Sequence, residues 1–143
     1  MKKVLVLHGP NINMIGEREP SIYGKETYDD INSDILKESE AMGIDCEIFF
    51  SNHEGALVDR IQAARKKHDG MIINAGALSH YSYSIRDAIA SVLIPCIEIH
   101  CSNIYKREEF RHHSVISPVC AGCITGFGKQ SYILALHGLK KML

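Results

Sequence analysis

The stretch Lys3-Val4-Leu5-Val6-Leu7-His8 is a short apolar run that ends in a polar residue. Runs of this length, rich in β-branched and other apolar residues, are typical of strands buried on both faces of a parallel sheet. Further runs of the same kind follow along the chain, at residues 45–51, 70–74, 96–101 and 121–125. The sequence therefore predicts five strands, of which 3–8 is the first.

Amphipathic segments separate these runs. Thr27 is a suitable cap for a helix that ends near Met42, and Gly43 is a suitable stop. Three further helices are predicted at about 54–67, 83–93 and 129–142, the first of them ending in a basic turn that complements the negative end of the helix dipole. Strands that alternate with helices indicate an α/β fold, here a doubly wound five-stranded parallel sheet with helices on both faces.

The length suits one domain, because 143 residues suffice to bury a core of their own. We therefore expect a single catalytic domain over residues 1–143. The segment 103–117 is polar and irregular, and we expect at most one short helix within it.

Composition argues against several classes of protein. Lys and Arg number 16 and Asp and Glu 17, so the formal net charge of −1 indicates neither a nucleic-acid footprint nor a membrane-binding patch. The first apolar run is too short for a signal peptide or a membrane span, and we expect a cytoplasmic protein. Five cysteines, an odd number scattered through apolar runs, favour buried reduced thiols over a disulfide framework.

Polar residues cluster where the predicted strands end. In a doubly wound sheet all parallel strands end at one edge, and ligands bind in the crevice outside those ends. Four strands deliver polar groups there: His8 and Asn11, Asn52 and His53, Asn74 and His80, and Glu98, His100 and Ser102. This convergence predicts a site at the carboxyl edge of the sheet.

The fourth strand carries a candidate acid. Its period of two places Cys96, Glu98 and His100 on one face, and Ile97, Ile99 and Cys101 on the other. Burying Glu98 costs several kcal/mol unless the carboxylate is paired, so His100 is its expected partner. Such a pair orients the imidazole and raises its basicity, as a general acid requires. The alternative is a purely structural ion pair.

A second candidate lies in the long loop between the first strand and the first helix. Residues 16–24 read Gly-Glu-Arg-Glu-Pro-Ser-Ile-Tyr-Gly, in a connection longer than the usual 2–6 residues or so. Arg18, Tyr23 and Lys25 place a phenol among cations, where it can become a base.

Two arginines follow the fourth strand. Arg107 and Arg111 are four residues apart and share a face if the segment is helical. Two guanidinium groups there suggest a carboxylate or phosphate ligand. The alternative is a solvated charged face in which they pair with Glu108 and Glu109.

Two other motifs do not indicate a functional site. Cys120-x-x-Cys123, near His112 and His113, resembles a zinc motif, but residues three apart on a strand point to opposite faces, so no metal site is predicted. Residues 126–129 lack the first glycine and the Ser or Thr of a phosphate loop, and we interpret them as a tight turn into the last helix. We expect His68 and His137 to be surface residues.

Several motifs together closely resemble one known family. They are Gly9-Pro10-Asn11-Ile12-Asn13, Gly16-Glu17-Arg18-Glu19-Pro20 with Tyr23-Gly24, Asn74-Ala75-Gly76-Ala77, His80, Ile85-Arg86-Asp87-Ala88, residues 98–104 (EIHCSNI), residues 110–114 (FRHHS) and Ser117-Pro118. In this order they resemble the type II 3-dehydroquinate dehydratases over nearly the whole chain. The chain departs from the family's usual residues at Ala75, Leu78, Tyr105 and Ser131, none of which is a catalytic position.

This resemblance implies a flavodoxin-like sheet and the third step of the shikimate pathway, the conversion of 3-dehydroquinate to 3-dehydroshikimate and water. It implies no cofactor and no metal, and a cytoplasmic homododecamer built from four trimers. The implied base is Tyr23, with Arg18 as its activator, and the implied acid is His100. The residues implied to hold the substrate are Asn74, His80, Cys101, Ser102 and Arg111, with Asp87 reaching into a neighbouring subunit's site.

The residue types suit an elimination through an enolate. A strong base is needed to remove a proton beside a ketone, and a guanidinium lowers the tyrosine pKa from about 10 by about 1–3 units. Asn11 can donate to the enolate, His100 supported by Glu98 can protonate the departing hydroxide, and Arg111, with Arg107 nearby, can hold the substrate carboxylate.

Alternatives from other classes are less well supported. A flavin module requires a phosphate loop after the first strand, where residues 10–13 make a poor amide cradle, and a phosphoacceptor module requires an acidic cluster at the strand ends. A structural assembly protein does not explain the convergence of polar residues. A flavodoxin-like module that binds a small anion without catalysis remains the main alternative.

Overall fold

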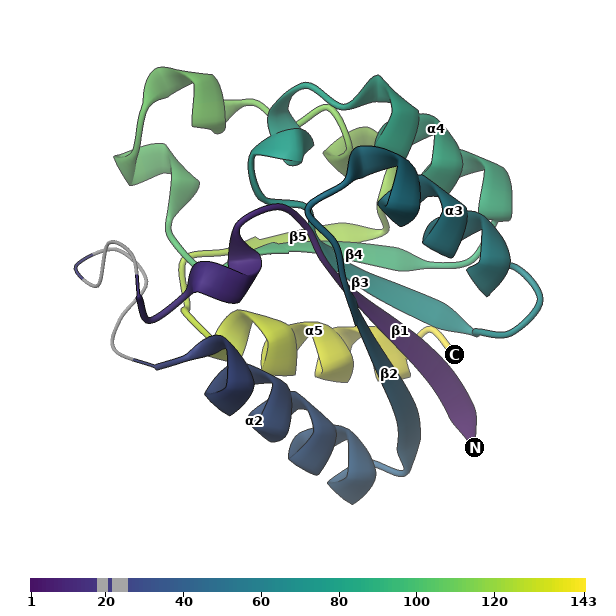
Figure 1. The fold of residues 1–143 in the computed structure, drawn as a ribbon. Helices are drawn as coiled ribbons and strands as arrows, with labels where there is room; N and C mark the ends of the chain where they lie inside the picture. Colours follow the sequence, from purple (N-terminus) through teal and green to yellow (C-terminus); the bar gives the residue numbers. More distant parts are fainter. Residues whose placement is uncertain (18–20, 22–25) are drawn as a thin grey trace.

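A parallel sheet forms the centre of the molecule in the computed structural model, which describes residues 1–17, 21 and 26–143. Its five strands are β1 (Lys2–His8), β2 (Ile44–Phe50), β3 (Gly70–Asn74), β4 (Cys96–His100) and β5 (Gly122–Thr125), in the spatial order β2-β1-β3-β4-β5 (Figure 1). The helices are α2 (Tyr28–Ala41), α3 (Glu54–Ala64), α4 (Tyr83–Val92) and α5 (Gln130–Lys140). The predicted doubly wound α/β fold is confirmed, and its strand order is that of flavodoxin-like proteins.

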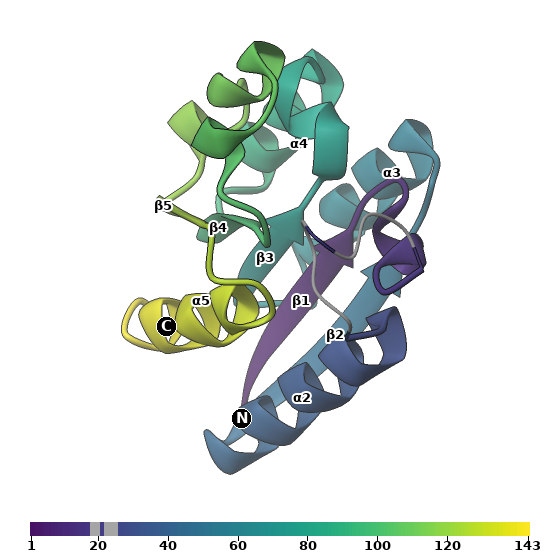
Figure 2. The same ribbon diagram turned by 90° about the vertical axis from the view of Figure 1, so that its left-hand side faces the viewer.

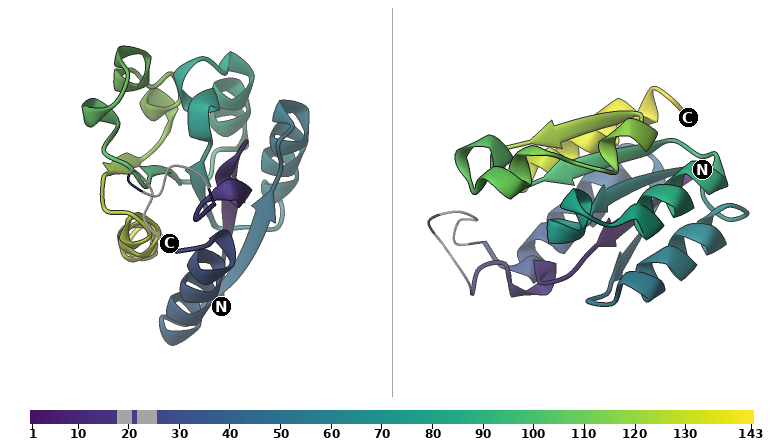
Figure 3. Two further views of the ribbon diagram at one scale, coloured as in Figure 1. Left: turned by 60° about the vertical axis from the view of Figure 1, so that its left-hand side comes forward. Right: turned by 90° about the horizontal axis from the view of Figure 1, so that it is seen from above.

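Helices cover both faces of the sheet. Alternate residues of β1 point to opposite sides, so Leu5 and Leu7 pack in the core beneath α3 and α4, whereas Val4 and Val6 pack in the core beneath α2 and α5. Figures 2 and 3 show these two helix layers on either side of the twisted sheet. Because both faces are covered, the central strands consist of uninterrupted apolar runs rather than alternating ones.

The beginning of α2 follows the predicted capping pattern. The Thr27 hydroxyl accepts a hydrogen bond from the Asp30 amide at 3.1 Å, and the Asp30 carboxylate accepts one from the Thr27 amide at 3.1 Å. This capping box satisfies two amides that the helix itself leaves unpaired. After the helix, Gly43 takes a positive φ of 72°, as expected of a helix stop.

Several local predictions are wrong. Helix α3 ends at Ala64, and a turn with i to i−3 hydrogen bonds replaces its predicted basic end. His68, expected at the surface, is buried, and its Nε2 lies 2.9 Å from a Glu47 carboxylate oxygen. Cys123, expected to be buried, is exposed. His137 is exposed as predicted, and residues 126–129 form the predicted turn into α5.

The segment after β4 contains more structure than predicted. Three short 3-10 helices follow one another, η3 (Ile104–Lys106), η4 (Glu109–His112) and η5 (Ser117–Val119), where one short helix was expected. Two others, η1 (Ile12–Met14) and η2 (Gly76–His80), follow β1 and β3. None of the described helices has the length and apolar character needed to cross a membrane.

Glycine brings two strand ends into close contact. The Gly9 amide donates to the Asn74 carbonyl at 2.8 Å, and a Cβ atom on Gly9 would lie only 2.6 Å from the Ala75 carbonyl oxygen. The obstruction is backbone, which cannot rotate away as a side chain can. Gly9 therefore allows the loop after β1 to pack against the loop after β3.

We predict that Gly9→Ala lowers the free energy of unfolding by about 1–3 kcal/mol, because the added methyl group forces the two backbones apart. Urea denaturation measures this change. Gly55→Ala is the matched control, since a Cβ at this exposed position of α3 has no atom within 4 Å, and it should stabilise the protein by up to about 1 kcal/mol. Equal stability of Gly9→Ala and the unsubstituted protein would contradict the close approach.

Candidate active site

A cavity of about 100 Å³ opens at the carboxyl edge of the sheet. It lies beside the ends of β1, β3 and β4, and the strand order reverses between β1 and β3. This switch point is where doubly wound sheets bind their ligands. The predicted site residues that line it are Asn11, Asn74, His80, His100, Cys101, Ser102, Arg107 and Arg111.

Two of the described site residues do not line this cavity. Glu98 lies behind His100 and has no exposed surface. Asp87 is exposed on α4, and its role in a neighbouring subunit stays a prediction. Arg18 and Tyr23 lie outside the described residues.

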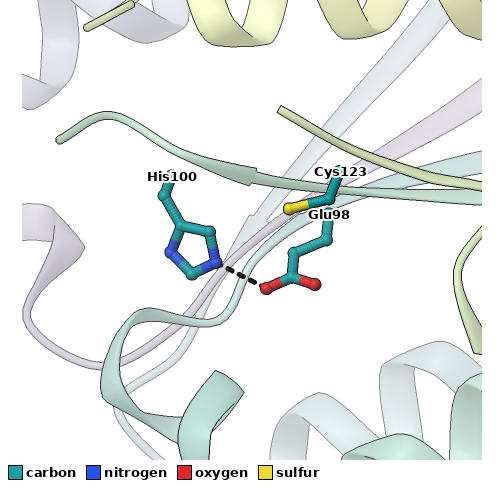
Figure 4. Close-up of side chains that lie close together, drawn as sticks. All are labelled: Glu98, His100 and Cys123. Carbon is teal, nitrogen blue, oxygen red and sulfur yellow. Dashed lines mark hydrogen bonds and ion pairs between the residues drawn. The ribbon is translucent and has the colours of Figure 1, made fainter. Parts of the chain in front are cut away.

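The carboxylate of Glu98 supports the His100 ring. His100 Nε2 lies 2.5 Å from a carboxylate oxygen of Glu98, and the second ring nitrogen points away from Glu98 (Figure 4). Burial by itself raises the pKa of Glu98, but hydrogen bonds from His100 and Ser117, the charge of His100 and a hydrogen bond from Ser114 outweigh it, so that pKa lies below its usual value. Glu98 is therefore ionised at neutral pH and accepts from Nε2–H. The predicted pair of Glu98 and His100 is confirmed as a contact.

Two serines complete the environment of Glu98. The Ser114 hydroxyl lies 3.0 and 2.9 Å from the two carboxylate oxygens, and the Ser117 hydroxyl donates to one of them. Neither serine was predicted to have a role. The available signal was the burial of Glu98, because a buried carboxylate requires more donors than one imidazole supplies.

His80 packs against the face of the His100 ring. The two rings stack with their centroids 5.9 Å apart, and His80 Nδ1 lies 2.8 Å from the His113 carbonyl oxygen. Burial and the nearby charges of His100 and Arg111 lower the pKa of His80 despite the bond to His113. His80 is therefore neutral at pH 7 with its proton on Nδ1, and its Nε2 is an acceptor.

The two arginines lie in separate parts of the segment after β4, which is not one continuous helix, so the condition for a shared helical face is not met. Arg107 follows η3 and donates to the Ser102 hydroxyl at 3.3 Å. Arg111 belongs to η4, and its Nε donates to Glu108 at 2.9 Å. The pairing with Glu108 agrees with the alternative of a charged surface, yet both arginines line the cavity. Their positive charge favours an anionic ligand.

Asn11 is held in an unusual backbone conformation. Its φ of 69° lies in the left-handed region, and its amide donates to the Asn52 side-chain oxygen at 2.9 Å. Asparagine is one of the few residues that adopt this region readily. Strained residues that neighbouring groups fix in place are concentrated at functional sites.

A buried row of hydrogen bonds lies beneath Asn74. The Asn74 amide nitrogen is 2.9 Å from the Tyr132 hydroxyl, which is 2.9 Å from His8 Nδ1, and His8 Nε2 is 2.8 Å from the Asn32 side-chain oxygen. His8 was predicted to point into the crevice. This prediction is wrong, because the ring is fully buried between Tyr132 and Asn32. Tyr132 of α5 is itself fully buried and contacts the predicted substrate-binding residue Asn74.

Burial also decides the chemistry of Cys101. It raises the pKa of this thiol to about 12, so Cys101 is neutral at physiological pH and is a poor nucleophile. The cavity therefore combines cationic side chains, an imidazole with a buried carboxylate and a neutral thiol. This combination suits binding of an anion and proton transfer to it.

Comparison with known proteins agrees with this geometry. The family model described as dehydroquinase class II matches residues 2–140. A 3-dehydroquinate dehydratase from Bacillus cereus (strain AH820) is 55% identical over 143 residues, covering 100% of this chain and 98% of the relative. The crystal structure of a type II dehydroquinase from Butyrivibrio crossotus superimposes with a TM-score of 0.96 at 50% identity, covering 97% of each chain. That of Propionibacterium acnes gives 0.95 at 42% identity, covering 99% of this chain and 97% of the other.

The buried His8 makes stability dependent on pH. Burial lowers its pKa from 6.5 to about 4 despite the bond to Asn32, so the unfolded chain binds a proton more readily between these values. We predict that His8 makes the free energy of unfolding fall by roughly 3 kcal/mol as the pH falls from 6.5 to 4, at about 1.4 kcal/mol per unit.

Denaturant unfolding at several pH values measures this effect. The variant His8→Gln has no titrating group at this position. Its free energy of unfolding should therefore fall by roughly 3 kcal/mol less than that of the unsubstituted protein over the same pH interval, whatever its absolute stability. Parallel slopes for the variant and the unsubstituted protein would contradict the prediction.

Proposed function

Because the chain belongs to the class II dehydroquinase family, we propose that it is a 3-dehydroquinate dehydratase that forms 3-dehydroshikimate and water in the third step of the shikimate pathway. The observation that carries this proposal is the buried Glu98–His100 pair beside a cavity lined by two arginines. The family model covers residues 2–140, in keeping with one catalytic domain. A cytoplasmic homododecamer built from trimers is part of the same proposal, through the resemblance.

Substrate binding begins with its carboxylate. In the proposed complex Arg111 holds this group, with Arg107 nearby and backbone amides near Cys101 and Ser102 as further donors. Asn74 and His80 bind the ring hydroxyls. In the proposal the neighbouring subunit's copy of Asp87 completes the site, so that a single subunit on its own would be incomplete.

The first chemical step is removal of a proton beside the ketone. In the proposal the phenolate of Tyr23 takes this proton, and Arg18 lowers the tyrosine pKa to make the phenolate available. The electron pair of the broken C–H bond passes to the ketone oxygen and gives an enolate. No lysine is needed, because this route contains no imine.

The enolate oxygen requires donors placed in advance. Asn11 is the proposed donor, directly or through an ordered water. Its left-handed conformation and the hydrogen bond from its backbone amide to Asn52 support this assignment, since they fix the residue before substrate binds.

The second chemical step is loss of hydroxide by an anti elimination. As the enolate collapses, the C–O bond breaks and His100 gives its proton to the departing oxygen, which leaves as water. The ring nitrogen opposite Glu98 is the proposed donor, because Nε2 is committed to the carboxylate. The negative charge of Glu98 stabilises the imidazolium before this transfer.

We predict that the purified protein converts 3-dehydroquinate without added cofactor and in the presence of chelator. The product contains a conjugated enone, so ultraviolet absorbance grows as the reaction proceeds. Absence of any absorbance change with folded protein would instead favour a module that binds a small anion without catalysis.

We predict that Tyr23→Phe lowers kcat by about 100-fold or more and leaves KM nearly unchanged, because only proton abstraction loses its base. The same absorbance assay measures both constants. Tyr81→Phe is the matched control, since Tyr81 is exposed and lies outside the cavity lining. Substantial turnover by Tyr23→Phe would exclude Tyr23 as the base.

A further inference from the structure

Cys123 lies beside the Glu98–His100 pair although nothing in the proposed reaction uses it. Within the described residues, one group of three potential metal ligands has donor atoms that all lie within 4.8 Å of one another, namely Glu98, His100 and Cys123. Figure 4 shows the Cys123 sulfur on the same side of the sheet as the imidazole and the carboxylate. This group does not include Cys120, His112 or His113.

Strand register explains this arrangement. Cys123 of β5 is the register partner of Glu98 of β4, so their side chains leave the sheet on the same face. His100 follows Glu98 by two residues and shares that face. The sequence motif Cys120-x-x-Cys123 concealed this grouping, because the relevant neighbour of the second cysteine is Glu98 on the adjacent strand.

The three donor atoms suit a borderline-soft cation. Thiolate sulfur, imidazole nitrogen and carboxylate oxygen are the ligand types that Zn²⁺ takes, at about 2.3, 2.0–2.1 and 2.0–2.2 Å. Tetrahedral angles at these lengths separate neighbouring donors by about 3.3–3.6 Å. His100 Nε2 and the Glu98 oxygen, now 2.5 Å apart, would separate by about 1 Å, and Cys123 would move inward.

The surroundings provide two further requirements of a metal site. Ser114 and Ser117 donate to Glu98, and such outer bonds orient a ligating carboxylate. Cys123 is exposed on β5, an edge strand, which gives an ion in solution a route to the otherwise buried pair.

We propose that Glu98, His100 and Cys123 bind a thiophilic divalent cation such as Zn²⁺ and that its binding inhibits the enzyme. The Cys123 thiol releases its proton to solvent, the imidazolium of His100 releases the proton on Nε2 and keeps the one on Nδ1, and water fills the remaining position. The ion then occupies the place of the proton between His100 and Glu98. Imidazole bound to a metal through Nε2 cannot form imidazolium, and its remaining Nδ1–H is a far weaker acid than that of imidazolium, so His100 no longer acts as an effective general acid. The inhibitory part rests on the proposed function, whereas binding does not.

Binding is tested with Co²⁺, whose bond to a thiolate produces a charge-transfer absorption. We predict that Co²⁺ added to the reduced protein, with a thiol-free reductant, produces this absorption and tetrahedral bands in the visible. Cys123→Ser should abolish the charge-transfer absorption, because a serine hydroxyl is a poor ligand for these ions. Cys120→Ser is the matched control and should retain it. Absence of the absorption in the unsubstituted protein, or its persistence in Cys123→Ser, would overturn the site.

Inhibition is tested in the absorbance assay with 3-dehydroquinate and Zn²⁺. The unsubstituted protein and Cys120→Ser should lose activity and regain it with chelator. Cys123→Ser should retain its basal activity and require about 100-fold more Zn²⁺ for the same inhibition, since loss of a direct ligand costs at least as much as loss of an outer-shell partner. Equal inhibition of Cys123→Ser would overturn the inhibitory role. A cobalt absorption without any turnover would instead leave the site standing and contradict the proposed function.

Discussion

A carboxylate without solvent contact is the constraint on which the candidate site depends. Glu98 has no exposed surface, and an unpaired charge in its place would cost several kcal/mol. One of its partners, His100, comes from the same strand, whereas Ser114 and Ser117 come from the segment that follows. Pairing Glu98 therefore does more than orient an imidazole. It ties the segment between β4 and β5 to the sheet, and that segment carries both arginines over the cavity.

The other side of the cavity depends on close backbone packing. Gly9 and Ala75 bring the ends of β1 and β3 together, and the loop after β1 holds Asn11 in its left-handed conformation. Asn74 then lies between this loop and the buried Tyr132. The side of the cavity with the two arginines is thus held in place by charge, and the side with Asn11 and Asn74 by packing. Different kinds of substitution would therefore disturb the two sides.

The sequence was sufficient to predict the strands, the helices and the edge that holds the site. Strand periodicity and the rule for parallel strand ends do not depend on distant contacts, which is why the Glu98–His100 pair could be predicted from residues 96–101 alone. The partners Ser114, Ser117 and Tyr132 could not, because they approach through loops and a helix far along the chain. Arg107 and Arg111 were predicted at the right site, but sequence spacing could not show that the segment between them is not one continuous helix. Arg18 and Tyr23 lie outside the described residues, so their roles rest on family membership.

The hydrogen bonds in the buried row from Asn74 to Asn32 are all donated in the same direction along it. The Asn74 amide donates to the Tyr132 oxygen, the Tyr132 hydrogen is directed to His8 Nδ1, and His8 Nε2–H is directed to Asn32. An aspartate in place of Asn74 would keep the shape and supply no hydrogen, so the Tyr132 hydrogen would turn round and leave His8 Nδ1 without a donor. Keeping the shape of the Asn74 side chain is therefore not sufficient, because its hydrogens matter as well. A near-isosteric exchange at the cavity would change the tautomer or charge of a histidine two side chains away.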